Sequence, residues 1–150
     1  MDFSTPGLVV DLDVFETNVS AMREMLAGTG KTVRPHFKTH RTPELAKRQL
    51  GGAIQGATCA TVGEAEAVVD AGVDDVLIAN EVVDPGKIAR IAALASRARV
   101  MVAADDAGPV AELSKAASAA GSTVGVLVDV DVLLHRCGVE IGRASCRERV

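Results

Sequence analysis

The chain has 150 residues, 48% of them apolar, and a formal net charge of −4. This length suffices for one domain with a sizeable core. Because it has three Phe and no Tyr or Trp, the core must be built from Ala, Val, Leu and Ile. Nucleic-acid-binding surfaces need a basic stripe or stacking aromatics, so this composition argues against nucleic acid as a partner.

No segment predicts a membrane span or a signal peptide. The longest apolar runs, such as residues 124–128, have the length of a strand. Residues 1–6 contain neither a positive region nor an apolar signal core. Three cysteines without metal-like spacing predict no disulfide framework. We therefore expect a protein of the reducing cytoplasm that does not bind membranes.

The first predicted elements are a strand and a helix. Residues 7–12 form a short apolar run that indicates a strand, and Asp13 can cap the helix that follows. One face of this helix carries apolar residues at helical spacing, namely Phe15, Val19, Met22 and Leu26. Residues 28–30, Gly-Thr-Gly, end the helix.

The next segment, residues 34–41, reads Arg-Pro-His-Phe-Lys-Thr-His-Arg. A strand starting at residues 32–33 would place Arg34, His36 and Lys38 on one face. The following Thr-Pro-Glu at residues 42–44 predicts a helix, with Thr at the N-cap and Pro at the first helical position, which runs to about residue 50. Lys38 is therefore expected at or just past the carboxyl end of a strand.

That position suggests chemistry for Lys38. In parallel α/β folds, active sites lie at the carboxyl ends of the strands. Nearby Arg34, His36 and His40, together with partial burial, would disfavour the ammonium form of Lys38. A neutral amine is what a Schiff-base nucleophile requires. The alternative from these residues alone is a strand with a solvated basic face.

Beyond residue 56 the pattern repeats. Strands are predicted at residues 57–60, 75–79, 99–103 and 123–130, with helices at 61–71, 85–95 and 108–120 between them. Thr61 and Glu64 form a capping box. This alternation predicts a parallel sheet with helical crossovers, either a closed barrel or an open doubly wound sheet. No glycine-rich nucleotide-binding motif follows any of the strands.

Polar residues collect where the predicted strands end. They are Lys38, Asn80, Glu81, Asp105, Asp106, Asp129, Asp131, His135 and Arg136. Asp84 and Asp106 stand just before helices and are interpreted as caps. Arg136 has no helix to cap, and its guanidinium suits an anionic oxygen, although an exposed loop arginine without function is the alternative.

Five ordered segments, residues 5–13, 34–40, 59–66, 77–81 and 135–139, carry a resemblance to a known family. The most specific element is Pro-His-Phe-Lys-Thr-His at residues 35–40. In these segments the chain resembles the fold-type III pyridoxal-phosphate enzymes. It is most similar to the D-threonine aldolase and D-serine dehydratase family, and more distantly to alanine racemases.

The resemblance implies a fold and a cofactor. The fold would be α/β, the N-terminal part of a (β/α)8 barrel of the alanine racemase kind, truncated after about five strands. Lys38 would hold pyridoxal 5'-phosphate as an internal aldimine, and Arg136 would approach the phenolic oxygen of the cofactor. His36, His40 and Asn80 are further candidates for cofactor binding.

The resemblance also implies a reaction for the full-length parent, because this cofactor stabilises negative charge at Cα. The expected activity is a lyase of D-β-hydroxy amino acids, foremost D-threonine aldolase, which yields glycine and an aldehyde. D-serine dehydratase and D-3-hydroxyaspartate aldolase are alternatives within the family. An alanine racemase-like isomerase and a non-catalytic pyridoxal-phosphate homeostasis protein are alternatives of other classes. The racemase would need a second acid–base residue, commonly tyrosine, which the chain lacks.

The expected partner is a small D-amino-acid substrate, and a homodimer is one oligomeric state expected for the parent. A divalent metal is expected there too, with ligands in a C-terminal β domain that this chain does not contain. Residues 1–140 would form the partial barrel. Residues 141–150 resemble the translation of a sequencing adapter and are expected to be a non-native tail.

Two further expectations concern particular residues. Leu133 stands where the family usually has glycine, which allows an unusual backbone or a close backbone approach, so the placement of Arg136 is expected to be affected. A partial barrel should also expose apolar sheet edges, which would make the chain alone prone to aggregation.

Overall fold

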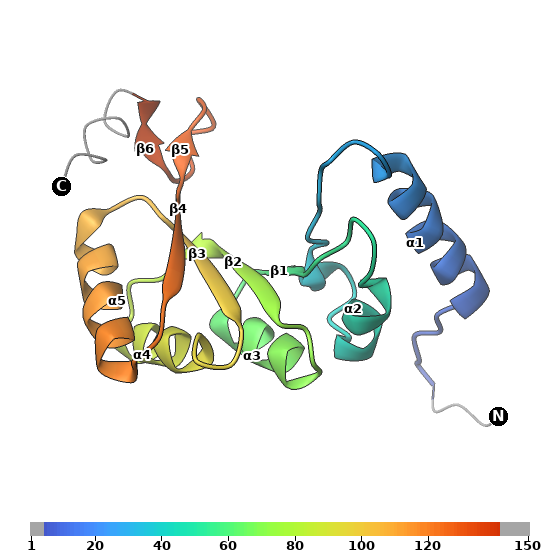
Figure 1. Ribbon diagram of the computed structural model, residues 1–150, viewed down its shortest axis with the longest axis horizontal. Helices are drawn as coiled ribbons and strands as arrows, with labels where there is room; N and C mark the ends of the chain where they lie inside the picture. Colours follow the sequence, from blue (N-terminus) through green and yellow to red (C-terminus); the bar gives the residue numbers. More distant parts are fainter. Residues whose placement is uncertain (1–4, 142–150) are drawn as a thin grey trace.

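The structure is a computed structural model that describes residues 5–141 (Figure 1). Its larger elements are the helices α1 Leu12–Leu26, α2 Pro43–Gln49, α3 Val62–Asp70, α4 Pro85–Leu94 and α5 Ala107–Ala120, and the strands β1 Ala57–Cys59, β2 Asp75–Glu81, β3 Arg99–Ala104 and β4 Val124–Val128. A 3-10 turn, η1 Phe37–Thr39, and two short strands, β5 Val130–Asp131 and β6 Val139–Glu140, complete them. The predicted alternation of strands and helices beyond residue 56 is confirmed.

The central sheet is parallel, with the strand order β1-β2-β3-β4. Strand residues of one parity, among them Cys59, Ile78 and Val102, are buried in the core. They pack against apolar residues of α3, α4 and α5, such as Val68 and Ile91. The helices thus cover one face of the sheet, as βα crossovers require.

Residues 33–36 extend this sheet beyond β1. Isolated parallel bridges join Val33 to Ile54 and His36 to Thr58. The Thr58 backbone N–H donates to the Pro35 carbonyl at 2.8 Å, and the Thr58 hydroxyl donates to the Arg34 carbonyl at 2.9 Å. The strand predicted to lead into Lys38 is therefore present only as a bridged segment that ends at His36.

The predicted strand at residues 7–12 is wrong. Within residues 5–141 this run pairs with no strand, Leu8 is fully exposed, and α1 already begins at Leu12. Asp11, and not Asp13, caps the helix, because its carboxylate accepts hydrogen bonds from the N–H groups of Asp13 (3.0 Å) and Val14 (3.1 Å). Asp11 has the extended backbone that an N-cap needs, whereas Asp13 lies inside the first helical turn.

Helix α1 makes few apolar contacts with the rest of the chain. Among its residues only Val19 is buried. Its main polar attachment is Arg23, whose guanidinium donates to the carbonyls of Leu50 (2.6 Å), Gln49 (3.1 Å) and Arg48 (3.3 Å). These carbonyls end α2, where a cation is favourable because they have no partners within the helix.

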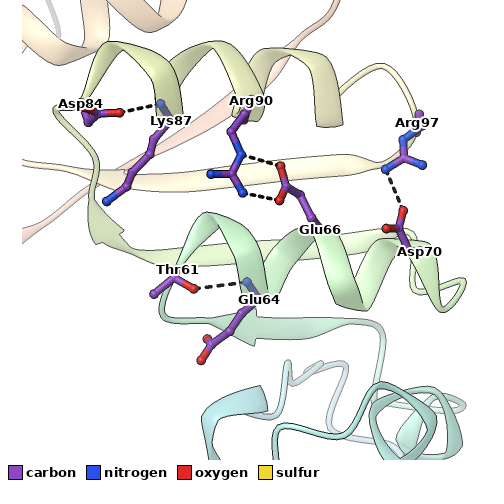
Figure 2. Close-up of polar contacts among 8 residues, drawn as sticks. All are labelled: Thr61, Glu64, Glu66, Asp70, Asp84, Lys87, Arg90 and Arg97. Carbon is purple, nitrogen blue, oxygen red and sulfur yellow. Dashed lines mark hydrogen bonds and ion pairs between the residues drawn. The ribbon is translucent and has the colours of Figure 1, made fainter.

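The predicted caps of the later helices are confirmed. Figure 2 shows the Thr61 hydroxyl accepting from the N–H of Glu64 (3.2 Å) and the Asp84 carboxylate accepting from the N–H of Lys87 (2.8 Å). Asp106 caps α5 by accepting from the Gly108 N–H. Thr42 occupies the N-cap of α2, but its hydroxyl donates to the His40 carbonyl and makes no capping bond.

Ion pairs on the outer surface join α3 to α4 and to the residues just after it. Figure 2 shows Glu66 of α3 bound by the Arg90 guanidinium through two hydrogen bonds, and Asp70 bound by Arg97 at 2.9 Å. The bond to Arg90 lowers the pKa of Glu66. These pairs fix the helices side by side at positions that are mostly exposed, where each pair contributes little to stability.

The edge of the sheet at β4 exposes apolar side chains, as the sequence predicts. Val126, Leu127 and Val128 are all partly open to solvent. The expected non-native tail lies outside the described residues except for Ile141, so its nature stays a prediction. In the part of the chain that the structure describes, no helix is long and apolar enough to cross a membrane.

Candidate functional site

Lys38 lies in the turn η1, just past the end of the bridged segment and at the carboxyl edge of the parallel sheet. Phe37 beside it is buried, 4% exposed, and its ring meets the ring of His40 edge-on with centroids 5.6 Å apart. The turn directs Phe37 into the core and leaves Lys38 exposed. The expected partial burial of Lys38 is therefore wrong, but its expected position is confirmed.

The basic residues expected around Lys38 are mostly occupied elsewhere. Arg34 binds the Asp75 carboxylate through Nε (2.8 Å) and Nη2 (2.9 Å), at the amino end of β2, and this hydrogen bonding raises the pKa of Arg34. His40 accepts from the Thr42 N–H through Nδ1 and lies 3.4 Å from Gln49 Oε1 through Nε2. Three basic side chains were predicted to crowd Lys38. This prediction is wrong for Arg34, which binds Asp75 instead, and His40 is hydrogen-bonded to Thr42 at the start of α2.

His36 is the basic residue that remains next to Lys38. Its Nδ1 accepts a hydrogen bond from the Lys38 backbone N–H at 3.3 Å. Partial burial, and then the Lys38 ammonium, lower the pKa of His36, while Glu64 acts in the opposite direction. His36 therefore presents a neutral imidazole near neutral pH and shapes the turn that carries Lys38.

Asn80 lies at the carboxyl end of β2 and is exposed. Its amide donates to the Ala60 carbonyl at 3.3 Å, which ties the ends of β1 and β2 together. The register between β2 and β3 also shifts here, between Ile78 and Glu81. Asn80 thus lies at the carboxyl edge of the sheet, as predicted, and its side-chain amide links the ends of β1 and β2.

Arg136 lies in the loop between β5 and β6 and is exposed. This loop contains two residues other than glycine with left-handed backbone, Leu133 at φ +75° and His135 at φ +50°. Leu133 therefore has the unusual backbone that glycine would allow at this position. His135 is held by Asp131, whose carboxylate accepts its N–H at 3.0 Å and lies 3.1 Å from its Nδ1.

The strand order separates Lys38 from Arg136. Lys38 follows the segment outside β1, whereas Arg136 follows β4 at the other edge of the sheet. Both stand beyond the carboxyl ends of parallel strands, but in residues 5–141 they belong to opposite edges. A closed barrel has no such edges, which is the arrangement that would bring them together.

One group at this end joins two of the predicted strand-end residues, Glu81 and Asp129, with Cys137, which was not predicted to lie there. Glu81, Asp129 and Cys137 place one carboxylate or thiol atom each within 4.8 Å of one another. A hydrogen bond to Asp129 is the main cause that raises the pKa of Cys137 to about 11, so the thiol stays protonated and acts as a donor. These residues come from three separate parts of the sequence, and no local spacing could indicate the group.

The donor set at the carboxyl edge suits an anionic carbonyl compound. Neither the Lys38 ammonium nor the Arg136 guanidinium has a carboxylate partner among the residues that the structure describes. A primary amine can attack an aldehyde, and an unpaired guanidinium binds phenolate or phosphate oxygens. Both requirements are met by exposed side chains in this chain.

Comparison with known proteins finds close relatives. D-threonine aldolase of Arthrobacter sp is 44% identical over 135 residues, covering 90% of this chain and 36% of that protein. 3-Hydroxy-D-aspartate aldolase of Paracoccus denitrificans is 40% identical over 141 residues, covering 92% of this chain and 36% of the relative. The chain therefore spans about a third of the length of the curated relatives it matches.

Solved structures agree with these relatives. The crystal structure of D-threonine aldolase from Filomicrobium marinum superposes with a TM-score of 0.86 at 44% identity, covering 91% of this chain and 37% of that one. The family model described as the alanine racemase N-terminal domain matches residues 10–147. The parallel α/β architecture, the ordered motifs and this match agree, and the chain belongs to the alanine racemase N-terminal domain family.

Proposed function

We propose that this chain supplies the cofactor lysine, Lys38, of a pyridoxal-phosphate-dependent lyase that acts on D-β-hydroxy amino acids, foremost as a D-threonine aldolase. The observation that carries the proposal is the 44% identity to D-threonine aldolase over 90% of the chain. The exposed Lys38 at the carboxyl edge of the sheet supports it. The activity belongs to the full-length protein, because the chain covers only 36% of that relative.

The side chains present fit the cofactor. Lys38 would hold pyridoxal 5'-phosphate covalently through Nζ, and Arg136 would pair with its phenolate oxygen. Both cations lack a carboxylate partner within residues 5–141, so neither has to break an ion pair to bind. When bound, this cofactor supplies an electron sink for charge that develops at the substrate Cα.

The protein's own groups then have distinct tasks. Lys38 Nζ, when not bonded to the cofactor, would be an amine that can hold or return a proton. His36 stays neutral and fixes the Lys38 backbone N–H, which orients the turn. Asn80 and His40, both bound to neighbouring groups, would line the cofactor rather than react with it.

A second candidate is 3-hydroxy-D-aspartate aldolase activity, which the 40% identity to that enzyme favours. Products separate the alternatives. D-threonine should give glycine and acetaldehyde in an aldolase but ammonia and a 2-oxo acid in a dehydratase, and L-allo-threonine, inverted at Cα alone, would indicate an isomerase. Binding of the cofactor without turnover of any D-amino acid would indicate the homeostasis protein. A divalent metal, a homodimeric parent and a cytoplasmic location stay predictions.

The central assignment is tested by borohydride reduction of the cofactor-loaded full-length protein, followed by peptide mapping. We expect the label on Lys38. Replacement of Lys38 by Ala should remove both label and activity, whereas Lys87→Ala, at another exposed lysine near the same edge, should keep both. A label on any other lysine of the unsubstituted protein would contradict the proposal.

A further inference from the structure

The buried charge of this chain lies at the far end of the segment that carries Lys38. Asp75 is only 9% exposed and is the buried charged residue among residues 5–141. Its carboxylate accepts both hydrogen bonds of the Arg34 fork, at 2.8 and 2.9 Å. Arg99 approaches the same carboxylate at 3.4 Å, from an exposed position. A carboxylate buried to this degree requires such partners.

The Arg34–Asp75 pair crosses a whole strand. Arg34 belongs to the bridged segment outside β1, and Asp75 begins β2 on the other side of β1. Gly56 lies between them, just before β1, and a side-chain carbon there would stand 2.2 Å from the Asp75 carbonyl oxygen. The absence of a side chain at Gly56 lets the strands approach this closely.

The bridged segment needs such a tether. Three backbone hydrogen bonds hold it to residues 53–58, and its two bridges, Val33–Ile54 and His36–Thr58, differ in register by one residue. A regular ladder therefore does not fix the register of this pairing, and a slip of one residue displaces the chain by about 3.3 Å and turns every side chain to the other face. In the described part of the chain, no other side chain of residues 33–38 makes a hydrogen bond to β2.

We propose that the Arg34–Asp75 pair positions Lys38, by locking the register of residues 33–36 against β1 and β2. The planar guanidinium, bound through its Nε and Nη2 atoms, fixes both the translation and the rotation of the segment, which a single point charge does not. Lys38 then stands at a defined place on the carboxyl edge. This inference rests on the proposed function, because it assigns the pair a role in attaching the cofactor.

The test uses the full-length protein in five forms: unsubstituted, Arg34→Lys, Arg34→Met, the double variant Arg34→Met/Asp75→Leu, and Arg97→Met as the control. Arg97 also binds an aspartate, Asp70, but on the surface and away from Lys38. Two quantities are measured: the dissociation constant of pyridoxal 5'-phosphate, and the fraction of Lys38 that carries the label after borohydride reduction. Thermal melting shows which variants are folded.

We expect Arg34→Met and the double variant to bind the cofactor about tenfold more weakly or worse, and to lose label at Lys38 in proportion. Arg34→Lys keeps a cation beside Asp75 but loses the fork, so it should fold and weaken binding to a smaller degree. Arg97→Met should match the unsubstituted protein in both quantities.

The double variant separates positioning from stability. It leaves no unpaired buried carboxylate, and such replacements are often neutral for folding. Unchanged affinity and labelling in the folded double variant would overturn the proposal, and so would unchanged values in Arg34→Lys. No label at Lys38 in the unsubstituted protein would instead overturn the proposed function, and this inference with it.

Discussion

At the scale of single residues, Leu133 has the backbone least suited to its side chain. Its φ of +75° lies in the left-handed region, where a Cβ atom costs about 1 kcal/mol or more, and its side chain is largely exposed. No packing of that side chain offsets the cost. The strain lies three residues before Arg136, within the same loop.

Replacing Leu133 by Gly should therefore stabilise the protein by about 0.5–1 kcal/mol, since the left-handed cost exceeds the entropy that glycine adds to the unfolded chain. Chemical denaturation of the full-length protein measures this. The control is Leu134→Gly, at a neighbour that is equally exposed but not left-handed, which should be neutral or destabilising. A loss of stability in Leu133→Gly would contradict the prediction.

His36 offers a second test at this scale, because burial and then Lys38 lower its pKa. The unfolded chain, with a histidine pKa of about 6.5, then binds more protons than the folded chain just below that pH. The contribution to stability is therefore complete above pH ~6.5 and is lost as the pH falls through this window.

An NMR titration of the cofactor-free protein should find the pKa of His36 below about 6.5. Lys38→Met should raise this pKa by removing the second cause, but not fully, because burial is the larger one. Lys115→Met, far from His36 on α5, is the control and should leave it unchanged. A fall of the pKa in Lys38→Met would refute this account.

At the scale of elements, the close approach of β1 and β2 can be tested by replacing each of two glycines with alanine. Gly56→Ala would place Cβ 2.2 Å from the Asp75 carbonyl oxygen, and backbone cannot move aside cheaply. We expect it to cost about 3 kcal/mol. Gly63→Ala, in the first turn of α3, meets only the flexible end of Arg90 at 3.9 Å and should be neutral or stabilising by up to about 1 kcal/mol.

Thermal denaturation of both variants in the full-length protein gives the comparison. A Gly56→Ala protein as stable as Gly63→Ala would show that β1 and β2 do not approach as closely as described. The same outcome would weaken the argument that Arg34 reaches across Gly56 to Asp75.

The helices and strands beyond residue 56 could be predicted because each carries local signals. Thr61, Asp84 and Asp106 cap their helices through side-chain bonds that depend only on neighbouring residues. The buried strands likewise appear as short apolar runs. Residues 7–12 gave the same apolar signal and failed, because a strand also needs a partner and none lies within residues 5–141.

The site was predictable in position but not in environment. Lys38 stands where the helix signal at residues 42–44 places it, just beyond paired backbone. The pairing of Arg34 with Asp75 depends on a contact across 41 residues of sequence, and the exposure of Lys38 depends on the turn that buries Phe37 instead. The group of Glu81, Asp129 and Cys137 likewise arises only when the ends of β2 and β4 meet the loop before β6.

At the scale of the whole molecule, one edge of the sheet is left apolar and open. Val128, in β4, is 55% exposed, and Val126 and Leu127 beside it are also accessible. Backbone groups at an open edge pair readily with other chains. The exposed apolar side chains add a driving force for association.

We therefore expect the 150-residue chain alone to self-associate, as measured by size-exclusion chromatography with light scattering. Val128→Lys should shift the distribution toward monomer, because a lysine on the edge opposes pairing. Ser118→Lys adds the same charge on exposed α5 and should change little. A monodisperse chain with a cooperative melt would be incompatible with this view.

The attachment of α1 has a consequence for motions of the native state. This helix buries only Val19, and it is otherwise held by the Arg23 guanidinium on the last carbonyls of α2 and by the exposed Glu16–Arg48 ion pair, apart from the sheet in Figure 1. Few apolar contacts mean a low free energy of local opening. The backbone amides of α1 should exchange with deuterated solvent through a local opening during which α3 and α4 stay folded. The substitution Arg23→Met should accelerate exchange in α1 and leave exchange in α3 and α4 unchanged.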